Sequence, residues 1–274
     1  DFRELDVDHD VYLSNLFIGG TSGVAFNDKS SVYMDKIIFN YNGPYLGLYG
    51  DDTCVLENEL GNAIHAAGYL EISNSVMQDT GGDAIYMEES AEVILDHVTI
   101  IGSSGHGISQ NTTDGSLIIT NSIIWGNDLG SLFFDEEVSA STIMVSHSDI
   151  EGGEITNFPD GLDLIWGDGN INEDPKFTLF LDSDNEDCLL SSDATLQWGS
   201  PCINGGDATY ENITGGYETI IYDNWGVDGF YYDGSLSEMG AFQFNLLENA
   251  VRSGDLKINE IMINPGGNVS EIFD

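Results

Sequence analysis

A six-residue phrase recurs along the first half of the chain and restricts its fold more than any other feature. Clear copies begin at Ile72, Leu95 and Ile119, and the spacing between them is nearly constant. Each copy alternates apolar with polar residues, as a strand does, and turn residues follow it. Units that repeat at such a period cannot bury their apolar faces alone, so they stack on one another. The sequence therefore predicts an all-β protein built as a parallel β-helix.

Further copies of the phrase extend the repeat in both directions. They begin at Leu13, Met34 and Val145, and Leu56 stands in phase within an irregular stretch. Shorter companion strands are predicted between the copies, at residues 23–26, 46–49, 62–65, 83–87, 105–109 and 131–134. We therefore predict about seven coils between residues 11 and 153, with one coil shortened or skipped before Ile72.

Equivalent positions of successive coils lie about 4.8 Å apart and form ladders. One ladder is predicted to contain Asn15, Asn74 and Asn121 together with Asp35 and Asp96. Asn and Asp side chains bond readily to nearby backbone groups and tolerate turn conformations. We expect these residues to hold turns rather than to form a site.

The chain is strongly acidic, with 48 acidic residues, six basic ones and a net charge of −42. A field of this sign repels phosphate backbones and anionic lipid surfaces, so we expect no nucleic-acid partner. No apolar run approaches the ~20 residues that cross a bilayer, so we expect no membrane insertion. The same field attracts cations. Two interpretations stay open, an adaptation to salt and calcium bound at particular acidic loops.

The three cysteines, Cys54, Cys188 and Cys202, are too few for a disulfide scaffold. Cys188 and Cys202 could form one disulfide. Alternatively, Cys202 is a small apolar side chain in a core ladder.

Three motifs in the last third of the chain resemble the right-handed parallel β-helix repeat proteins that bacteria secrete. The matching residues are Asn170, Ile171, Asp174, Pro175, Phe177, Ser200 to Ile203, Gly206 and Met239 to Phe242. The resemblance covers roughly residues 11–245 as a fold, and it implies a right-handed parallel β-helix, structural turns and core ladders at these motifs, and a secreted or cell-surface location. We assign residues 1–245 to this domain, with regular coils at about 11–153 and looser coils and a cap at 154–245. That family includes lyases, hydrolases and non-enzymatic surface proteins, so the resemblance does not choose among them.

The tail of the chain resembles a different family. Residues 256–265, Leu-Lys-Ile-Asn-Glu-Ile-Met-Ile-Asn-Pro, are similar to the first strand of a lamin-tail-type immunoglobulin-like domain. The resemblance implies that residues 246–274 form a linker and the first strand of a truncated following domain, and that the chain is part of a longer surface protein. A strand without its own sheet is free to pair with a neighbouring edge, which predicts self-association through residues 256–265.

A glycoside hydrolase needs two carboxylates about 5–9.5 Å apart. Acidic residues that follow the companion strands are the candidates, and they are Asp51, Asp52, Glu88 and Asp135. Glu88 and Asp135 would lie two coils apart, roughly 10 Å. A lyase is disfavoured, because it needs a basic residue to abstract a proton and none of the six Lys and Arg residues stands in a matching motif.

Two phrases resemble those of polygalacturonases, at residues 50–54 and 105–109. In that family the corresponding elements lie about one coil apart, whereas Asp52 and His106 are more than two coils apart here, and the later Arg-x-Lys element is absent. We therefore predict that His106 is a strand-end residue with a hydrogen-bond partner.

Two segments are candidates for calcium. Asp168, Asn170 and Asn172 have the spacing of an EF-hand-like loop but lack its Gly and its final Glu, and they coincide with a structural turn. Asp182, Asp184, Glu186 and Asp187 form a denser acidic cluster, which could equally be a solvated loop.

An aromatic segment is the candidate ligand-binding surface. Its rings, Trp225, Phe230, Tyr231 and Tyr232, stand among Gly and Asp residues. Such rings stack on sugars, or they cap the end of a solenoid. We predict a non-catalytic, extracellular structural or adhesive module that binds polysaccharide and calcium. The alternatives are a carbohydrate-active enzyme and a self-assembling filament subunit.

Overall fold

The computed structural model describes residues 10–19, 24–26, 31–40, 61–88, 90–112, 114–136, 138, 140–154, 159–180, 191–207 and 237–242. Within these ranges the chain forms strands, turns and bends, and it contains no helix long and apolar enough to cross a membrane. The chain divides into two units, Asp1–Phe244 and Asn245–Asp274, and every described residue belongs to the first. The predicted domain boundary at residue 245 lies outside the described residues.

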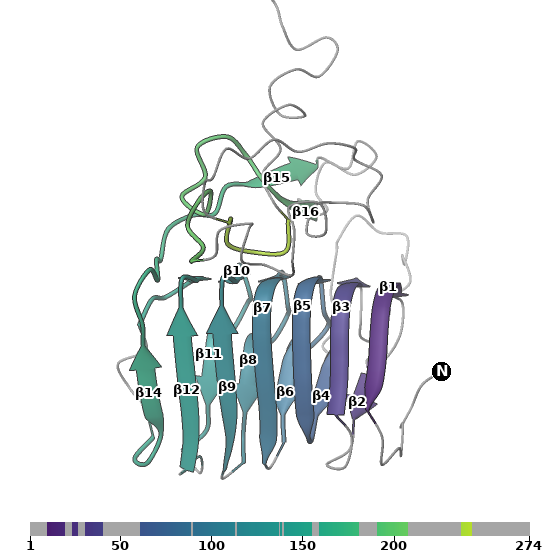
Figure 1. The fold of residues 1–274 in the computed structure, drawn as a ribbon, viewed down its shortest axis with the longest axis vertical. Coiled ribbons are helices and arrows are strands. Elements are labelled where there is room, and N and C mark those ends of the chain that lie inside the picture. The colour runs from purple at the N-terminus through teal and green to yellow at the C-terminus, as the bar shows by residue number, and fades with distance from the viewer. Residues whose placement is uncertain are drawn as a thin grey trace, which may run out of the picture. The chain divides into compact units, whose positions relative to one another are not determined.

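The long strands form one parallel sheet (Figure 1). Its strands lie in the order β1 (Val11–Gly19), β3 (Ser31–Asn40), β5 (Tyr69–Gln78), β7 (Ala91–Ile101), β9 (Asp114–Thr120), β12 (Ala140–Ser146) and β14 (Asp163–Trp166). Two short strands extend it, because β10 (Ile123–Trp125) pairs with β7 and with β13 (Asp149–Ile150). Each coil therefore adds one rung to this sheet.

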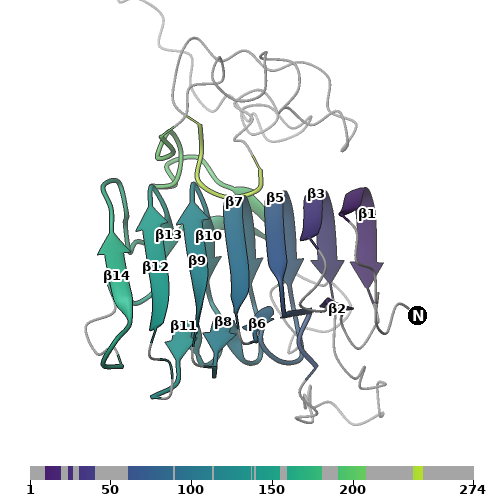
Figure 2. The same cartoon turned by 60° about the horizontal axis from the view of Figure 1, so that its bottom comes forward.

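A second parallel sheet is made of the shorter companion strands (Figure 2). It contains β2 (Val24–Phe26), β4 (Ile64–Ala66), β6 (Ile85–Met87), β8 (His106–Gln110) and β11 (Gly130–Phe134), in chain order. Outside the stack, β15 (Phe177–Phe180) pairs antiparallel with β16 (Ser191–Leu196).

The two sheets share one apolar core. In the long sheet, Met34, Ile72, Leu95, Ile119 and Val145 pair rung by rung at one position, and all of them are buried. Alternate residues of the second sheet, among them Ile64, Ile85 and Ile108, pack into the same cluster. Because a single coil cannot enclose such a core, stacking is what stabilises it. The predicted parallel β-helix is confirmed.

One predicted coil is wrong. Met34 pairs directly with Ile72, and Val24 pairs directly with Ile64. The coil predicted around Leu46–Tyr49 and Leu56, which lie outside the described residues, therefore places no strand between these rungs in either sheet. The pairing of neighbouring rungs sets the register of a solenoid, and an insertion of similar length adds residues without adding a rung. The spacing of Leu56 from Met34 therefore matches the repeat by coincidence.

The stack continues beyond residue 153, into the segment where looser coils were predicted. In the added rung, β14 pairs with β12, and Val145 lies beside Trp166. Val145 and Trp166 are 21 residues apart, close to the spacing of the earlier rungs, but Gly-Asp-Gly follows Trp166 in place of the repeated phrase, so the rung is not evident in the sequence. Among the described residues, the long sheet has seven strands along its path, and five coils add a strand to the second sheet.

Candidate functional site

Most of the long strands bend at an equivalent position, which forms a polar corner along the stack. The bending residues have positive φ values between 46° and 60°, and they are Asn15, Lys36, Asn74, His97, Asn121 and His147. Asn adopts this left-handed conformation more readily than most side chains do. The predicted ladder is thus correct for its three asparagines. It is wrong by one residue for Asp35 and Asp96, which stand before the bend.

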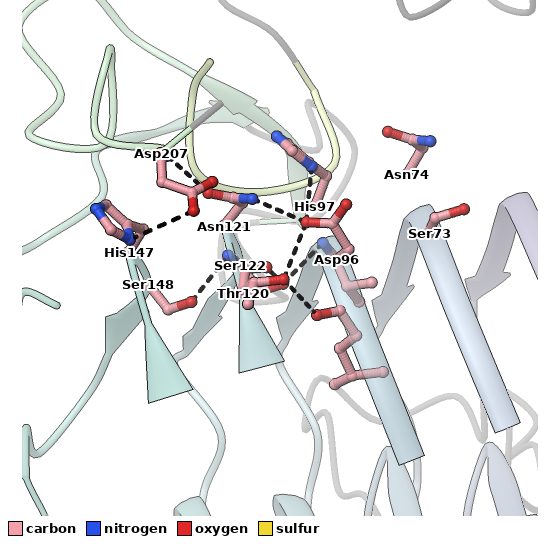
Figure 3. A network of polar contacts seen from close by, with 12 residues as sticks. Ser73, Asn74, Asp96, His97, Thr120, Asn121, Ser122, His147, Ser148 and Asp207 are labelled. Carbon is pink, nitrogen blue, oxygen red and sulfur yellow. Dashed lines mark hydrogen bonds and ion pairs between the residues drawn. The ribbon is translucent and has the colours of Figure 1, made fainter. Parts of the chain in front are cut away.

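These two aspartates tie neighbouring rungs together. Asp96 Oδ1 accepts hydrogen bonds from Thr120 Oγ1 at 3.0 Å and from Asn121 Nδ2 at 2.9 Å (Figure 3). His97 Nδ1 lies 3.1 Å from the same oxygen. Asp35 Oδ1 accepts equivalent bonds from Ser73 and Asn74 in its own neighbouring rung. Burial alone would raise the pKa of Asp96, but the hydrogen bonds outweigh it and hold that pKa below its ordinary value.

A serine ladder follows directly after the bend. Its members are Ser75, Ser122 and Ser148, and all three are buried. Each hydroxyl donates to a carbonyl two residues earlier and accepts the backbone N–H of the preceding rung, at 2.6–2.8 Å and 3.0–3.1 Å respectively. Asn170 continues the ladder by accepting from the Ser148 N–H at 3.1 Å. These bonds satisfy backbone groups that the bend removes from the sheet.

Asn121 joins the corner to the C-terminal part of the described chain. Its Oδ1 accepts the Asp207 N–H at 2.9 Å, and its carbonyl accepts the Gly240 N–H at 2.7 Å. Its own N–H donates to the Ser146 carbonyl at 3.3 Å. Every polar group of Asn121 is therefore engaged within the protein. The corner is therefore a structural joint at Asn121, as expected, although Nε2 of the corner residue His97 is buried without a hydrogen-bond partner among the described residues.

The first predicted calcium segment has similar internal contacts. Asn172 Oδ1 accepts the Gly152 N–H at 3.1 Å, and Asn170 Nδ2 donates to the Val145 carbonyl at 2.9 Å. Asp168 is exposed, and its carbonyl accepts the His147 N–H. Among the described residues, no group of three or more His, Cys, Asp or Glu is placed to hold a metal ion. These contacts are those of a turn, and calcium binding here stays a prediction.

Cys202 is a free, buried thiol. It donates to Asp149 Oδ2 at 3.1 Å, and Asp149 Oδ1 accepts the Glu173 N–H at 3.2 Å. Burial raises the pKa of Asp149 to about 6, although the bond from Cys202 opposes the shift. Burial and the Asp149 charge also raise the pKa of Cys202, so it is an unreactive thiol. Cys202 therefore has the second of its two predicted roles, that of a small side chain in the core. Cys188 lies outside the described residues.

The outer face of the second sheet carries a row of rings across successive rungs. By register, His65 lies beside Tyr86, Tyr86 beside Ser109, and Ser109 beside Phe133. The His65 ring stacks on Tyr86 with centroids 4.4 Å apart, and the His106 ring stacks on Phe133 at 4.6 Å. We call His65, Tyr86, His106 and Phe133 the ring row. It presents flat apolar surfaces on the outside of the stack.

Carboxylates hold both imidazoles of the ring row. Glu88 Oε1 lies 2.7 Å from His65 Nδ1, and Asp83 Oδ1 lies 3.3 Å from His106 Nδ1. Asp83 also accepts from the His106 N–H at 2.6 Å and from Ser109 Oγ at 2.5 Å. Burial would raise the pKa of Asp83, but the bonds from His106 and Ser109 outweigh it and lower that pKa. The prediction that His106 is a strand-end residue with a partner is confirmed.

The polar edges of the ring row are only partly used by the described residues. Both carboxylates contact Nδ1, and within the described ranges no hydrogen bond reaches Nε2 of His65 or of His106. The His65 side chain is 39% exposed and the His106 side chain 18%, so solvent reaches both rings. The row therefore combines ring faces with two outer nitrogen atoms and nearby carboxylates. This is the candidate site.

The structure brings Glu88 to His65 rather than to Asp135. Met87 pairs with Gln110, and Gln110 pairs with Phe134, so Glu88 and Asp135 follow strands two rungs apart. Two rungs correspond to about 10 Å, as predicted. The remaining predicted site residues lie outside the described residues, and they are Asp51, Asp52, Asp182, Asp184, Glu186, Asp187, Trp225, Phe230, Tyr231 and Tyr232. For them the predictions stay predictions.

Sequence reasoning missed His65, Tyr86 and Phe133 as site residues. A usable signal was present, because each stands in a short companion strand between two residues that face the core. Alternation places such a residue outside. Three outward rings at one ladder position were therefore readable from the repeat.

Comparison with known proteins gives one match. A family model described as a right-handed β-helix region matches residues 22–173. No curated protein and no solved structure matches the chain.

Proposed function

Because this chain belongs to the family of right-handed β-helix regions, we propose that it is a non-catalytic structural or adhesive module of a larger extracellular protein. In this proposal the module binds polysaccharide along the ring row. The observation that carries it is the outward stacking of His65 on Tyr86 and of His106 on Phe133, with carboxylates beside both pairs.

Flat rings with polar groups at their edges suit a sugar polymer. Aromatic faces pack against apolar C–H surfaces, and edge donors and acceptors fix orientation. In the ring row, Tyr86 and Phe133 supply faces, while Glu88 and Asp83 supply acceptors. The net charge of −42 disfavours acidic polymers, so neutral polysaccharides are the expected class.

Binding without catalysis is favoured by the state of Asp83. A general acid in a glycoside hydrolase needs a raised pKa, so that it is protonated near neutral pH. The contacts from His106 and Ser109 lower the pKa of Asp83 instead. Asp83 is therefore built to stay charged and to position its neighbours.

Retention on immobilised polysaccharides tests the proposal. The chain is passed over neutral and acidic polymers, with calcium or with chelator, and the polymers are then sized. We expect neutral polymers to retain the chain unshortened, and Tyr86→Ala and Phe133→Ala to weaken binding about tenfold each. Trp198→Ala is the matched control, because this ring is 72% exposed and lies outside the ring row. Equal retention of all three variants, or no retention of the original chain, would overturn the proposal.

A carbohydrate-active enzyme is the second candidate. The observation that favours it is the pair of solvent-accessible histidines with Nδ1 on a carboxylate, since such imidazoles serve as general acids or bases through Nε2. Shortening of a polymer by the original chain, and no shortening by His106→Gln, would support this candidate. Unshortened polymer across the whole panel would exclude it for those substrates.

Calcium is proposed as a stabilising ion at Asp182, Asp184, Glu186 and Asp187. The support is the density of carboxylates in the sequence, together with the field of the whole chain. Unfolding is followed by heating with calcium and with chelator. A higher Tm with calcium, lost when these four residues are changed to Asn or Gln, supports the site, and an unchanged Tm contradicts it.

Self-association through residues 256–265 is proposed because the sequence predicts a strand there without its own sheet, which is free to pair with a neighbouring edge. Its measure is the solution mass of the full chain at rising concentration, compared with a chain that ends at residue 254. Fibres or oligomers that vanish on truncation support it. A strictly monomeric full chain contradicts it.

A further inference from the structure

A second group of rings lies on the outer face of the long sheet, in its first three rungs. Tyr12 pairs with Tyr33, and their rings are nearly parallel, 9° apart in orientation, with centroids 4.7 Å apart. Tyr69 of the next rung contacts Tyr33 at 5.6 Å, tilted by 50°. We call Tyr12, Tyr33 and Tyr69 the tyrosine row.

The tyrosine row faces outward. Val32 and Met34, which flank Tyr33, are both buried in the core, so alternation turns Tyr33 away from it. Tyr12 is 71% exposed, which leaves the outer part of the stack open. The second sheet packs on the opposite side of the same core, so the tyrosine row and the ring row lie on different faces of the solenoid.

The repeat itself does not require these rings. On the same face, one ladder runs from Tyr12 and Tyr33 through Glu71 to four aliphatic side chains, which are Ile94, Ile118, Met144 and Ile165. Aliphatic residues therefore satisfy the ladder in the later rungs. The concentration of tyrosines in the first rungs is a local property of the surface.

Carboxylates accompany the tyrosine row. Glu71 Oε2 accepts a hydrogen bond from the Tyr69 hydroxyl at 2.8 Å, and Glu71 pairs with Tyr33 across the rungs. Asp10 is exposed and stands two residues before Tyr12. Partial burial and the bond to Glu71 raise the pKa of Tyr69 to about 12, so its hydroxyl remains a donor. Burial raises the pKa of Tyr33, and the charges of Asp10 and Glu71 add to the shift, so these charges reach the rings.

Rings beside carboxylates favour a cation. A protonated amine gains from the face of a tyrosine ring and from a nearby negative charge, and the net charge of −42 raises its local concentration. Apolar faces of sugar rings gain from the same aromatic surfaces. An amino-sugar polymer supplies both features in one ligand.

We propose that the tyrosine row is a second binding surface, separate from the ring row, that takes a polysaccharide bearing protonated amino sugars. It extends the proposed function by naming the ligand class of a different face. Where both rows are occupied, one molecule holds two polymer chains, and only this last step rests on the binding proposed for the ring row.

The experiment measures binding of a glucosamine hexamer and of its fully N-acetylated counterpart to the full chain by calorimetry. We expect binding of the hexamer that weakens at least tenfold in Tyr12→Ala/Tyr33→Ala and weakens with added salt. N-acetylation removes the positive charge and should weaken binding at the tyrosine row to a similar extent, measured in Tyr86→Ala so that binding of the neutral hexamer at the ring row is reduced. Ile165→Ala, which changes the same ladder far from the tyrosines, is the control and should leave the affinity unchanged.

A second variant keeps the test decisive if the double variant is poorly folded. Glu71→Gln retains an acceptor for Tyr69 while removing one charge, and we expect severalfold weaker binding of the hexamer with a smaller salt dependence. No binding of the hexamer, or equal binding by all variants, overturns the proposal. Tyr86→Ala reports on the ring row separately: if it alone weakens hexamer binding, the amine site lies on the other face and the tyrosine proposal is wrong.

Discussion

The polar corner and the ring row both run across successive rungs of one solenoid, yet they differ in what their polar groups contact. At the corner, Asn121 uses its side chain and its backbone entirely within the protein. In the ring row, His65 and His106 each give one nitrogen to a carboxylate, and their rings remain accessible to solvent. The first arrangement fixes the chain, whereas the second keeps bonding capacity for a ligand.

The difference shows where to search for function in a repeat protein. Ladder position alone does not separate a structural residue from a binding residue, because both recur with the coil. Unused hydrogen-bonding capacity on an exposed face does separate them, since buried polar groups are expected to be satisfied. By this measure the polar corner is structural, and the outer face of the second sheet carries the candidate site.

The largest effect is expected from Asn121→Ala. The change removes the bonds to Asp96 and Asp207 and places Ala at a φ of 49°, which it adopts poorly. We expect a loss of about 4 kcal/mol in the free energy of unfolding, measured by urea denaturation. Thr142→Ala, at an exposed position of β12, is the control. A loss below about 0.5 kcal/mol would mean that the corner is not a structural joint.

Asp149→Asn is expected to change the pH dependence of stability. The pKa of Asp149 rises from 3.8 to about 6 on folding, so its stabilising effect is full below about pH 4 and is lost as the pH rises through 6. Relative to the original chain, the free energy of unfolding of Asp149→Asn should therefore rise by about 2 kcal/mol between pH 4 and pH 7. Denaturation at both pH values measures this difference, with exposed Asp160→Asn as control. A difference that is the same at both pH values would contradict the burial argument.

A smaller effect is expected from Asp83→Asn in the ring row. The lowered pKa of Asp83 means that its contribution is present above its ordinary pKa and is lost as the pH falls through the lowered value. At neutral pH we expect a loss of about 1 kcal/mol in stability and about threefold weaker polysaccharide binding, because His106 is no longer held. Both quantities are measured. Lost stability with unchanged binding would mean that Asp83 has a structural role and no role in polysaccharide binding.

The fold was predictable from the sequence because the phrase that forms each rung of the long sheet is repeated. The aligned phrases at Met34, Ile72, Leu95, Ile119 and Val145 are neighbours in the register that the structure shows. The predicted coil at Leu56 failed because periodicity cannot distinguish a rung from an insertion of similar length. The position of Asp35 and Asp96 failed for a related reason, since one residue decides which side of the bend a side chain occupies.

The candidate site was less predictable, because it depends on contacts between coils. His65 and Glu88 come from successive coils, and so do Asp83 and Ser109. Their carboxylate–imidazole and carboxylate–hydroxyl contacts exist only once the rungs are stacked. Composition pointed instead to the densest acidic and aromatic segments, because those are visible without the register. Alternation within the short strands predicts which rings face outward, but only the register shows which of them lie side by side.

The smallest effect is expected from shortening the connection between β3 and β4. This change tests whether the extra residues of the connection are needed for the rungs to stack. In the next coil, the short segment 79–84 connects β5 to β6, whereas the much longer segment 41–63 connects β3 to β4. Since β3 pairs directly with β5 and β2 with β4, the extra residues add no rung. Replacing residues 43–59 with a Gly-Ser pair should change stability by only about 1 kcal/mol, and binding at the ring row should persist. Cooperative unfolding that is lost on shortening would show that this segment belongs to the core, and lost binding with intact unfolding would move the polysaccharide site toward it.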